Sequence, residues 1–296
     1  MINNINNKSL SCPVCRGRSP KLVTEKNGWT YYRCRPCSLV FIHPQPSPEF
    51  LAAKYQEYLP DNEDRIRDWR LSMEEVIRKS AQLIEKERGP GRILDVGCGY
   101  GFFLDHMAGR GWQVEGVEIS PLGRAYAARH FPALKLRETP LPDPDLPSNY
   151  YEAVTLFYVV EHLPDPIRVL KEARRILKPG GVLLLRWPHS TPIVRLLGPL
   201  GRGLDLYHTP YHLFDYSPRF MEKTLADLGF ESIRTTIAGN TRPRDRLGRW
   251  SSMIFGGLGE FLSRVTGGRL LLPGVSKTTV ARKIPSAFPS SPKNQR

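Results

Sequence analysis

The sequence predicts an α/β fold in which helices cover both faces of a mostly parallel sheet, with a small zinc ribbon at the N-terminal end. Three observations support this fold class. Strand-like and helix-like segments alternate between residues 92 and 236, two C-x-x-C pairs stand within the first 45 residues, and a glycine-rich turn follows the first strand of the alternating region. Repeated strand–helix units build a parallel sheet that is buried on both sides.

The length and charge of the chain limit the classes of protein that it can belong to. The chain has 296 residues, of which 40% are hydrophobic, so one large domain with small attachments can bury a core. The net charge is +14, and residues 1–40 and 240–296 hold the excess of Lys and Arg. Such ends attract anionic partners, whether nucleic acid, an acidic membrane or a substrate. No apolar run is long enough for a spanning helix or a secretory signal, so a cytoplasmic location is expected.

Residues 1–45 are predicted to form the zinc ribbon. Cys12 and Cys15 form the first C-x-x-C pair, and Cys34 and Cys37 form the second after eighteen intervening residues. Each pair presents two sulfur atoms, and two pairs complete a tetrahedral thiolate site with no open position, which is typical of structural zinc. Metal binding then folds a segment that is too short to fold alone. Two redox-active pairs are the alternative.

Residues 46–90 are predicted to form connecting helices. Ser47 is a helix N-cap residue and Pro48 follows at the first helical position. Apolar residues then recur at helical spacing between Ile66 and Ile84. This apolar face either packs on the core or forms a lid over a site.

Residues 91–239 are predicted to form the core of the sheet, with strands that are short apolar runs between turn signals. Strands are expected at 92–96, 113–118, 133–137, 153–158, 182–186 and 230–236, with a turn at 178–181. Helices are expected to begin at residues 102, 121, 166 and 218. After these come a basic amphipathic insertion at 240–276, a final core strand within 277–285 and a disordered tail at 286–296.

The glycine loop after the first core strand indicates a nucleoside-containing ligand. Glycines between a strand and a helix let a ligand approach the backbone and the free amides of the helix. Gly97, Gly99 and Gly101 form the loop, and Glu118 ends the next strand, where an acid accepts two ribose hydroxyls. A dinucleotide site needs a small residue at position 102, which is Phe102 in this chain.

These motifs resemble those of a known enzyme family. Leu94–Gly101 and Val117-Glu118 resemble the first and second cofactor motifs of class I S-adenosylmethionine-dependent methyltransferases, and Val160–Pro166 with LKEARRILKPGG resembles their ubiquinone-biosynthesis-like branch. The cysteine ribbon, Leu204-Asp205 and His212–Ser217 are similar to a bacterial subgroup associated with sugar, polysaccharide or secondary-metabolite modification. The resemblance implies a Rossmann-like sheet of seven strands, mostly parallel.

The resemblance also implies which residues contact the cofactor, S-adenosyl-L-methionine. The glycine loop would lie against its methionine end. Asp95, before the loop, would lie near its amino group, and Glu118, after the second strand, would contact the ribose. The residues implied are Asp95, Gly97, Gly99, Gly101, Glu118, Ile119, Glu138 and Thr139. Glu138 departs from the family pattern, in which this adenine contact is commonly Asp.

His162 is the candidate catalytic residue. It follows the fourth core strand, where the resemblance puts it beside the cofactor sulfur, and a histidine can take a proton from an acceptor hydroxyl near neutral pH. A packing role is the alternative. His208, Tyr211 and His212 follow the fifth strand on the same edge of the sheet and are candidates for the acceptor pocket.

Two functions follow from these residues. The first is methyl transfer to a small-molecule, sugar or lipid-linked acceptor, with oxygen as the expected acceptor atom. The alternative is RNA methylation, with the zinc ribbon and the basic ends binding nucleic acid. The insertion at 240–276 combines four arginines with apolar residues at helical spacing, so it is expected either to rest on an anionic membrane, at its inner face, or to pack on the sheet or a second subunit.

Overall fold

A computed structural model describes residues 10–56, 58–198, 205–242 and 246–285 of the chain. The predicted disordered tail at 286–296 lies outside the described residues, as do Leu204 and Arg244. In the part that is described, no helix combines the length and the apolar character needed to cross a bilayer.

The main sheet confirms the predicted fold class. Its order is β10-β11-β8-β7-β4-β5-β6, and β11 runs antiparallel to both of its neighbours while the other pairs are parallel. The strands are β4 (Arg92–Val96), β5 (Gln113–Val117), β6 (Lys135–Arg137), β7 (Tyr151–Phe157), β8 (Leu177–Trp187), β10 (Phe230–Thr236) and β11 (Lys277–Lys283). The reversal of chain order between β7 and β4 makes the cleft in which ligands of such sheets bind.

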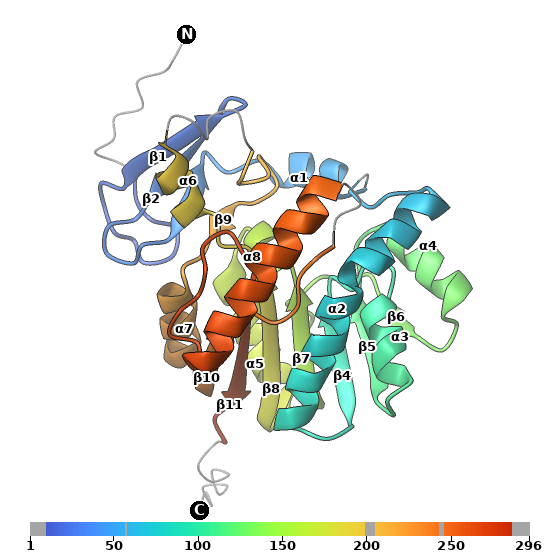
Figure 1. Cartoon of the computed structure of the whole chain (residues 1–296). Coiled ribbons are helices and arrows are strands. Elements are labelled where there is room, and N and C mark those ends of the chain that lie inside the picture. The colour runs from blue at the N-terminus through green and yellow to red at the C-terminus, as the bar shows by residue number, and fades with distance from the viewer. Residues whose placement is uncertain (1–9, 57, 199–204, 243–245, 286–296) are drawn as a thin grey trace, which may run out of the picture.

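Helices cover both faces of this sheet (Figure 1). Alternate residues of a strand point to opposite faces of a sheet. In β4, Ile93 therefore packs in the apolar cluster on one face and Leu94 in the cluster on the other. The first cluster lies under α2 (Glu63–Glu87), α3 (Phe102–Ala108) and α4 (Pro121–His130), and the second under α5 (Pro166–Ile176) and α7 (Pro218–Asp227). The helix α8 (Arg246–Val265) lies beside α2 (Figure 1).

Short polar side chains start these helices. Asn62 precedes α2, and its side-chain oxygen accepts a hydrogen bond from the amide of Asp64 at 2.9 Å. Ser120, Asp165 and Ser217 cap α4, α5 and α7 in the same way, each followed directly by a proline. A capping oxygen satisfies an amide that has no partner within the helix, and proline fits there because it lacks that amide.

The ribbon is joined to the core by a second sheet that the sequence did not predict. Its order is β1-β2-β3-β9, from β1 (Lys21–Lys26), β2 (Trp29–Arg33), β3 (Val40–His43) and β9 (Phe214–Asp215). The strand β9 belongs to the core region, between α6 (Thr191–Leu197) and α7, yet it pairs with β3. The hydroxyl of Tyr31 also donates to the carbonyl oxygen of His212 at 2.9 Å. The ribbon therefore supports one wall of the core.

The turn predicted at residues 178–181 is an irregularity within β8, where the pairing with β7 skips these residues and Gly180 has a positive φ angle. These residues belong to β8, whose first residue Leu177 pairs with Tyr151 before the register shifts. The Glu152 side chain stabilises this extension, since it accepts a hydrogen bond from the amide of Arg92 at 2.6 Å and forms an ion pair with Lys178. The glycines at 180 and 181 therefore lie at a strand irregularity.

We expect Trp187→Ala to lower the free energy of unfolding by about 3–5 kcal/mol, the usual cost of truncating a buried tryptophan. Trp187 is fully buried near the end of β8, and its indole nitrogen donates to the hydroxyl of Thr279 at 3.2 Å. Urea denaturation followed by circular dichroism measures the change. Leu22→Ala, which truncates an exposed residue of β1, should change stability by less than about 0.5 kcal/mol. Equal midpoints for the two variants would contradict this packing.

Candidate active site

A cavity of about 690 Å³ lies at the carboxyl ends of the central strands. Asp95 and the loop 97–100 contribute from β4, residues 118–120 from β5 and residues 157–159 from β7. Side chains of the segment before β4, among them Tyr58 and Met73, line the opposite side. The predicted connecting helices thus both pack on the core and cover the cavity.

The glycine loop bends sharply between β4 and α3 because its glycines adopt positive φ angles. A Cβ at Gly97 would lie 2.5 Å from Cγ2 of Val159, so only glycine fits there. No atom lies within 4 Å of a Cβ built at Gly99, which also lines the cavity, so its backbone is open to a ligand. Gly101 instead caps α3 under Leu134 and lies outside the cavity lining.

Glu118 joins the glycine loop to the end of β5. One carboxylate oxygen accepts from the amide of Gly99 at 2.7 Å, and the other accepts from the amide of Ser120 at 2.7 Å. Burial raises the pKa of Glu118, and these two backbone hydrogen bonds oppose the rise because they favour the charged form. The carboxylate keeps further lone pairs for donors in the cavity.

Asp95 lies at the floor of the cavity. Burial raises its pKa to about 8, a hydrogen bond from Thr155 at 2.6 Å opposes the rise, and the negative charge of Glu118 adds to it. A cation that enters beside Asp95 would reverse this shift, since an opposite charge favours the ionised acid. Asp95 therefore stays mainly neutral near pH 7 until such a cation arrives, and the two neighbouring acids favour a cationic group at this end of the cavity.

The structure does not bring all the implied adenine contacts together. Ile119 lines the cavity and is half exposed. The Glu138 side chain is 74% exposed and pairs with Arg124 at 3.1 Å, and neither Glu138 nor Thr139 is among the lining residues. The chain turns after β6 so that the next residues, 140–142, line the cavity in their place. The apolar pair Leu141-Pro142 in the sequence could have indicated that this segment lines the cavity.

His162 lies in the 3₁₀ turn η1 (Val160–His162), where it is buried and lines the cavity. Its Nδ1 atom is 2.9 Å from the carbonyl oxygen of Tyr211 and 3.2 Å from the hydroxyl of Tyr55. A carbonyl oxygen can only accept, so Nδ1 carries the proton and Nε2 carries the lone pair. Burial lowers the pKa of His162 to about 4, which keeps the imidazole neutral near pH 7.

Glu161, the residue before His162, is fully buried. Within the described part of the chain, neither of its carboxylate oxygens has a hydrogen-bond partner. Burial raises its pKa to about 8, so the neutral acid dominates near pH 7. Glu161, His162 and His212 present donor atoms within 4.8 Å of one another, a set that could hold a metal ion.

The residues predicted for the acceptor pocket form one ring cluster with His162. The His162 and His212 rings are 4.9 Å apart, and the His208 and Tyr211 rings are 5.0 Å apart. Of the three predicted residues, His212 lines the cavity, whereas His208 and Tyr211 support it from behind. The carbonyl of Tyr211, rather than its side chain, makes the contact that orients His162.

Sequence reasoning missed the aromatic residues that cover this end of the cavity. Tyr55, at the end of α1 (Pro48–Gln56), and Tyr58 both contact the His162 ring, with centroids 5.8 Å away. Trp69 and Met73 of α2 line the same side. Tyr55 and Tyr58 are aromatic residues three positions apart in a largely polar segment, and this spacing could have indicated a shared contact. Their contact with His162 depends on the fold.

The four predicted zinc ligands lie together outside this cavity. The sulfur atoms of Cys12, Cys15, Cys34 and Cys37 lie within 4.8 Å of one another. The distance is 3.8 Å between Cys12 and Cys37 and 3.4 Å between Cys15 and Cys34. A tetrahedral site with zinc–sulfur bonds of about 2.3 Å places its sulfur atoms about 3.8 Å apart, so this cluster fits the ion.

Comparison with known proteins gives a consistent picture. A family model described as a methyltransferase domain matches residues 58–235. A probable S-adenosylmethionine-dependent methyltransferase of Mycolicibacterium smegmatis is 30% identical over 47% of this chain and 51% of its own length, so the chain spans about half of that relative. A ubiquinone biosynthesis O-methyltransferase of Dechloromonas aromatica is 30% identical over 53% of this chain and 67% of its own length.

Solved structures share the fold at low sequence identity. A SAM-dependent methyltransferase from Archaeoglobus fulgidus superposes with a TM-score of 0.52 at 19% identity, covering 75% of this chain and all of that one. A Haloferax volcanii complex of the Trm112 methyltransferase activator with a putative methyltransferase gives a TM-score of 0.55 at 16% identity, covering 79% of this chain and 97% of that one. These likenesses concern the fold alone.

Proposed function

The chain belongs to the methyltransferase domain family, and from this premise we propose that it transfers the methyl group of S-adenosylmethionine to a hydroxyl of a small amphipathic or lipid-linked acceptor. The observation that carries the proposal is the position of Glu118. Its carboxylate is held by the amides of Gly99 and Ser120 at the edge of a cavity whose far side carries His162. A nucleoside site and a base thus share one cavity.

The residues of the cavity fit the cofactor. We assign its ribose to Glu118, its amino group to Asp95 and its methionine end to the open backbone at Gly99, beside Gly97. The raised pKa of Asp95 supports the amino-group assignment, because a buried acid without a cation is held in its neutral form. When bound, the cofactor supplies an electrophilic methyl group on a positively charged sulfur.

His162 is proposed to accept the proton of the acceptor hydroxyl. The Nδ1–H group donates to Tyr211, which fixes the ring and leaves Nε2 as the basic nitrogen. The aromatic side chains of Tyr55 and Tyr58 exclude water around it, and exclusion of water favours the transfer of a methyl group over hydrolysis. Relatives named as O-methyltransferases support oxygen as the acceptor atom.

The character of the cavity lining supports an amphipathic acceptor over RNA. Aromatic and aliphatic side chains make up much of the cavity lining, among them Trp69, Met73 and Phe103. Arg168 is the one Lys or Arg side chain among the described lining residues, so a polyanion has no cationic track into the cavity. The aromatic residues suit a substrate with apolar carbon atoms.

We also propose that the four-cysteine cluster binds one structural zinc ion. The close sulfur–sulfur distances support a single shared ion, and the position of the cluster keeps it away from the transfer chemistry. Zinc would join the turn before β1 to the turn between β2 and β3, and through β3 it would support the strand β9. Its role is then to stabilise the wall that carries His212.

We expect Glu118→Ala to weaken cofactor binding by about 1.5–3 kcal/mol, the range for hydrogen bonds to a charged group. Isothermal titration calorimetry measures the affinity, and thermal unfolding checks that the loop still folds. Glu138→Ala is the matched control, because Glu138 is exposed and lies outside the lining, so its affinity should stay unchanged. Equal affinities for wild type and both variants would refute the ribose assignment.

We expect His162→Ala to lower kcat by roughly 100-fold or more with little change in cofactor affinity, as for loss of a general base. The neutral imidazole is the active form, so activity is lost as the pH falls through its pKa. Because burial lowers this pKa to about 4, the acid limb of the wild-type pH profile should lie well below the ordinary value of 6.5. His130→Ala, on the exposed end of α4, should retain wild-type turnover. An unchanged kcat in His162→Ala would assign His162 to packing.

We expect Cys34→Ser to reduce bound zinc from one ion per chain to a small fraction, because three thiolates cannot complete the closed site. Metal analysis of freshly purified, reduced protein measures this. Cys98→Ser is the control, since Cys98 lies in the glycine loop and should leave the zinc content at one. Wild-type protein without zinc would exclude a structural ion here.

A further inference from the structure

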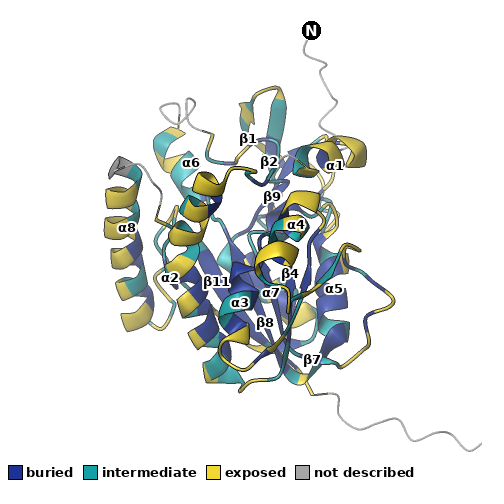
Figure 2. Cartoon of the chain, turned by 90° about the vertical axis from the view of Figure 1, so that its right-hand side faces the viewer, coloured by how far each residue is buried: buried dark blue, intermediate teal, exposed yellow. Residues whose placement is uncertain are grey.

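An ordinary amphipathic surface helix buries its large apolar side chains, and α8 has the opposite orientation. Its small residues Gly256, Gly259 and Ser263 are buried against the sheet, and its large apolar residues face away from the protein. Figure 2 shows α8 exposed along its outer side and buried along the side that faces the sheet. The expectation that the apolar face of the insertion packs on the sheet is therefore wrong.

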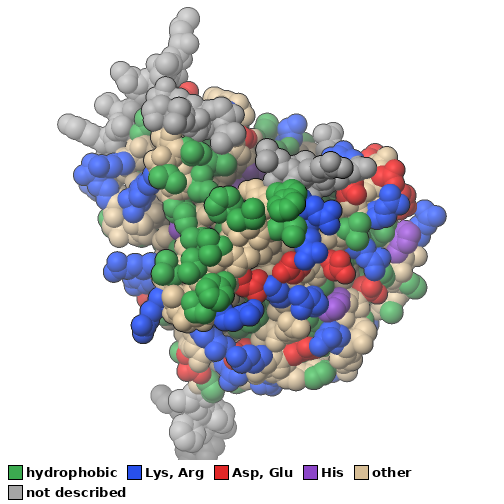
Figure 3. Space-filling model, viewed as in Figure 1, with side chains coloured by type: hydrophobic (Ala, Val, Ile, Leu, Met, Phe, Trp, Pro, Cys, Tyr) green, Lys and Arg blue, Asp and Glu red, His purple; other side chains and the backbone are tan. Residues whose placement is uncertain are grey.

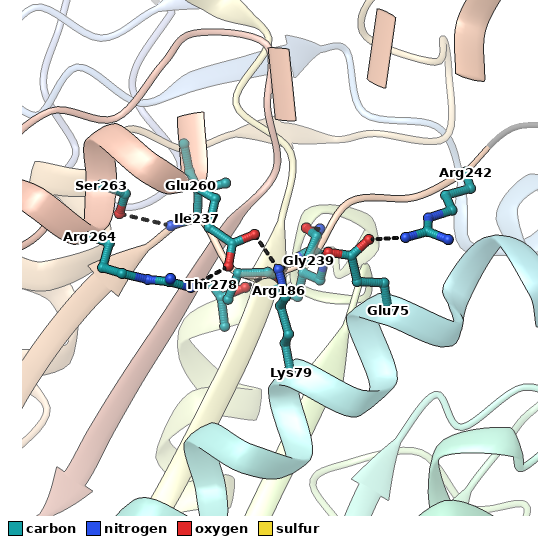
Figure 4. A network of polar contacts seen from close by, with 11 residues as sticks. Glu75, Lys79, Arg186, Ile237, Gly239, Arg242, Glu260, Ser263, Arg264 and Thr278 are labelled. Atoms are coloured by element: carbon teal, nitrogen blue, oxygen red, sulfur yellow. Dashed lines mark hydrogen bonds and ion pairs between the residues drawn. The ribbon is translucent and has the colours of Figure 1, made fainter. Parts of the chain in front are cut away.

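Close backbone contact and polar bonds hold α8 in this orientation (Figure 4). A Cβ at Gly259 would lie 3.1 Å from Cδ1 of Ile237, so the helix approaches the end of β10 closely. The hydroxyl of Ser263 accepts from the amide of Ile237 at 3.1 Å. Glu260 forms an ion pair with Lys79 of α2. These contacts would be lost if α8 rotated to bury its large side chains.

The outward face is a continuous apolar surface. Its residues are 48–66% exposed and recur at helical spacing along the whole helix. They are Trp250, Met253, Ile254, Leu258, Phe261 and Val265, with Phe255 at one edge. In Figure 3 hydrophobic side chains gather in a band over α8, with basic side chains on both sides of it. Single exposed apolar residues are ordinary, but a patch of this extent marks an interaction surface.

The charges around this apolar face indicate an anionic surface as its partner. Arg249 and Arg264 of α8 are exposed, and the Arg264 side chain reaches 77% exposure. Glu260, the one acid of the helix, forms ion pairs with Lys79 of α2 and, at 3.0 Å, with Arg264. Among the described side chains of α8, none of the exposed ones is acidic. Basic residues that flank an aromatic and aliphatic face are the pattern of helices that lie in a membrane interface.

The first turns of α8 are tied to the rim of the active-site cavity. Ser252 donates to the carbonyl oxygen of Thr241, which lines the cavity. The amide of Arg242 donates to the carbonyl of Ser72, another lining residue, at 3.0 Å. Arg242 also pairs with Glu75 of α2 at 2.9 Å. A surface that covers α8 therefore lies close to this part of the cavity.

We propose that the outward face of α8 docks on an anionic lipid membrane and holds the cavity rim against the lipid layer that contains the acceptor. The apolar side chains enter the boundary between headgroups and acyl chains, while the arginines contact anionic headgroups. The docking surface does not depend on the proposed methyl transfer. Only the statement that the lipid layer contains the methyl acceptor rests on that function.

Vesicle flotation of the full-length protein, without cofactor or acceptor, tests the proposal. Vesicles of phosphatidylcholine and phosphatidylglycerol should carry the wild type, and vesicles of phosphatidylcholine alone should carry much less. Arg249→Gln with Arg264→Gln should weaken binding to the anionic vesicles on the order of 20-fold, since each basic residue near the surface contributes about fivefold. High salt should have a similar effect.

The apolar contribution is tested by a matched pair of double variants. Ile254→Ser with Phe261→Ser should weaken vesicle binding at least about tenfold, because two apolar side chains no longer enter the interface. Leu22→Ser with Leu122→Ser removes two exposed apolar residues elsewhere and should bind like wild type. Calorimetric titration with the cofactor checks that each variant keeps an intact active site.

Two results would overturn the proposal. The first is a wild-type protein that stays with the soluble fraction at low salt. The second is a wild-type dimer, seen by sedimentation equilibrium, that becomes a monomer in Ile254→Ser with Phe261→Ser, while vesicles carry neither protein. The outward face of α8 would then bind a second copy of the chain. Methyl transfer that is retained in either case would leave the proposed function intact. The experiments therefore distinguish failure of the membrane proposal from failure of the proposed function.

Discussion

The carboxylate of Glu118 is the contact on which the candidate site depends. It accepts hydrogen bonds from the amides of Gly99 and Ser120, so one buried acid joins the turn after β4 to the turn after β5. Without such an acceptor these amides would be unsatisfied inside the protein. The same two bonds favour the charged form of the acid against its burial. One side chain thus joins two turns of the sheet edge and also lines the cavity.

Burial sets the protonation state of the groups around the cavity. It lowers the pKa of His162, so that a neutral base is present, and it raises the pKa of Asp95 and Glu161, so that each acid is mainly neutral until a cation arrives. Burial is the first cause of each shift, and at His162 the rings of Tyr55 and Tyr58 contribute to that burial. The two tyrosine rings therefore help to keep the His162 imidazole neutral near pH 7.

The ribbon and α8 are attached to the core in opposite ways. The ribbon completes its sheet with β9 and supports the residues behind His162, so it acts through the wall of the cavity. The helix α8 is held by its glycines, Ser263 and Glu260, which leaves its large apolar side chains outside. One attachment supports a wall of the cavity, and the other leaves an apolar surface exposed.

The sequence by itself determined the main sheet and the local elements of the site. The positive-φ glycines, the capping residues of α2 and α5 and the two C-x-x-C pairs act over a few residues, so their effect can be read from the chain. Contacts between distant segments could not be predicted. The pairing of β3 with β9, the approach of Tyr55 to His162 and the exposure of Glu138 depend on how the elements pack. The orientation of α8 is the clearest case, since its hydrophobic pattern is compatible with either face inward. The close fit of Gly259 against Ile237, the hydrogen bond of Ser263 and the Glu260–Lys79 ion pair decide it.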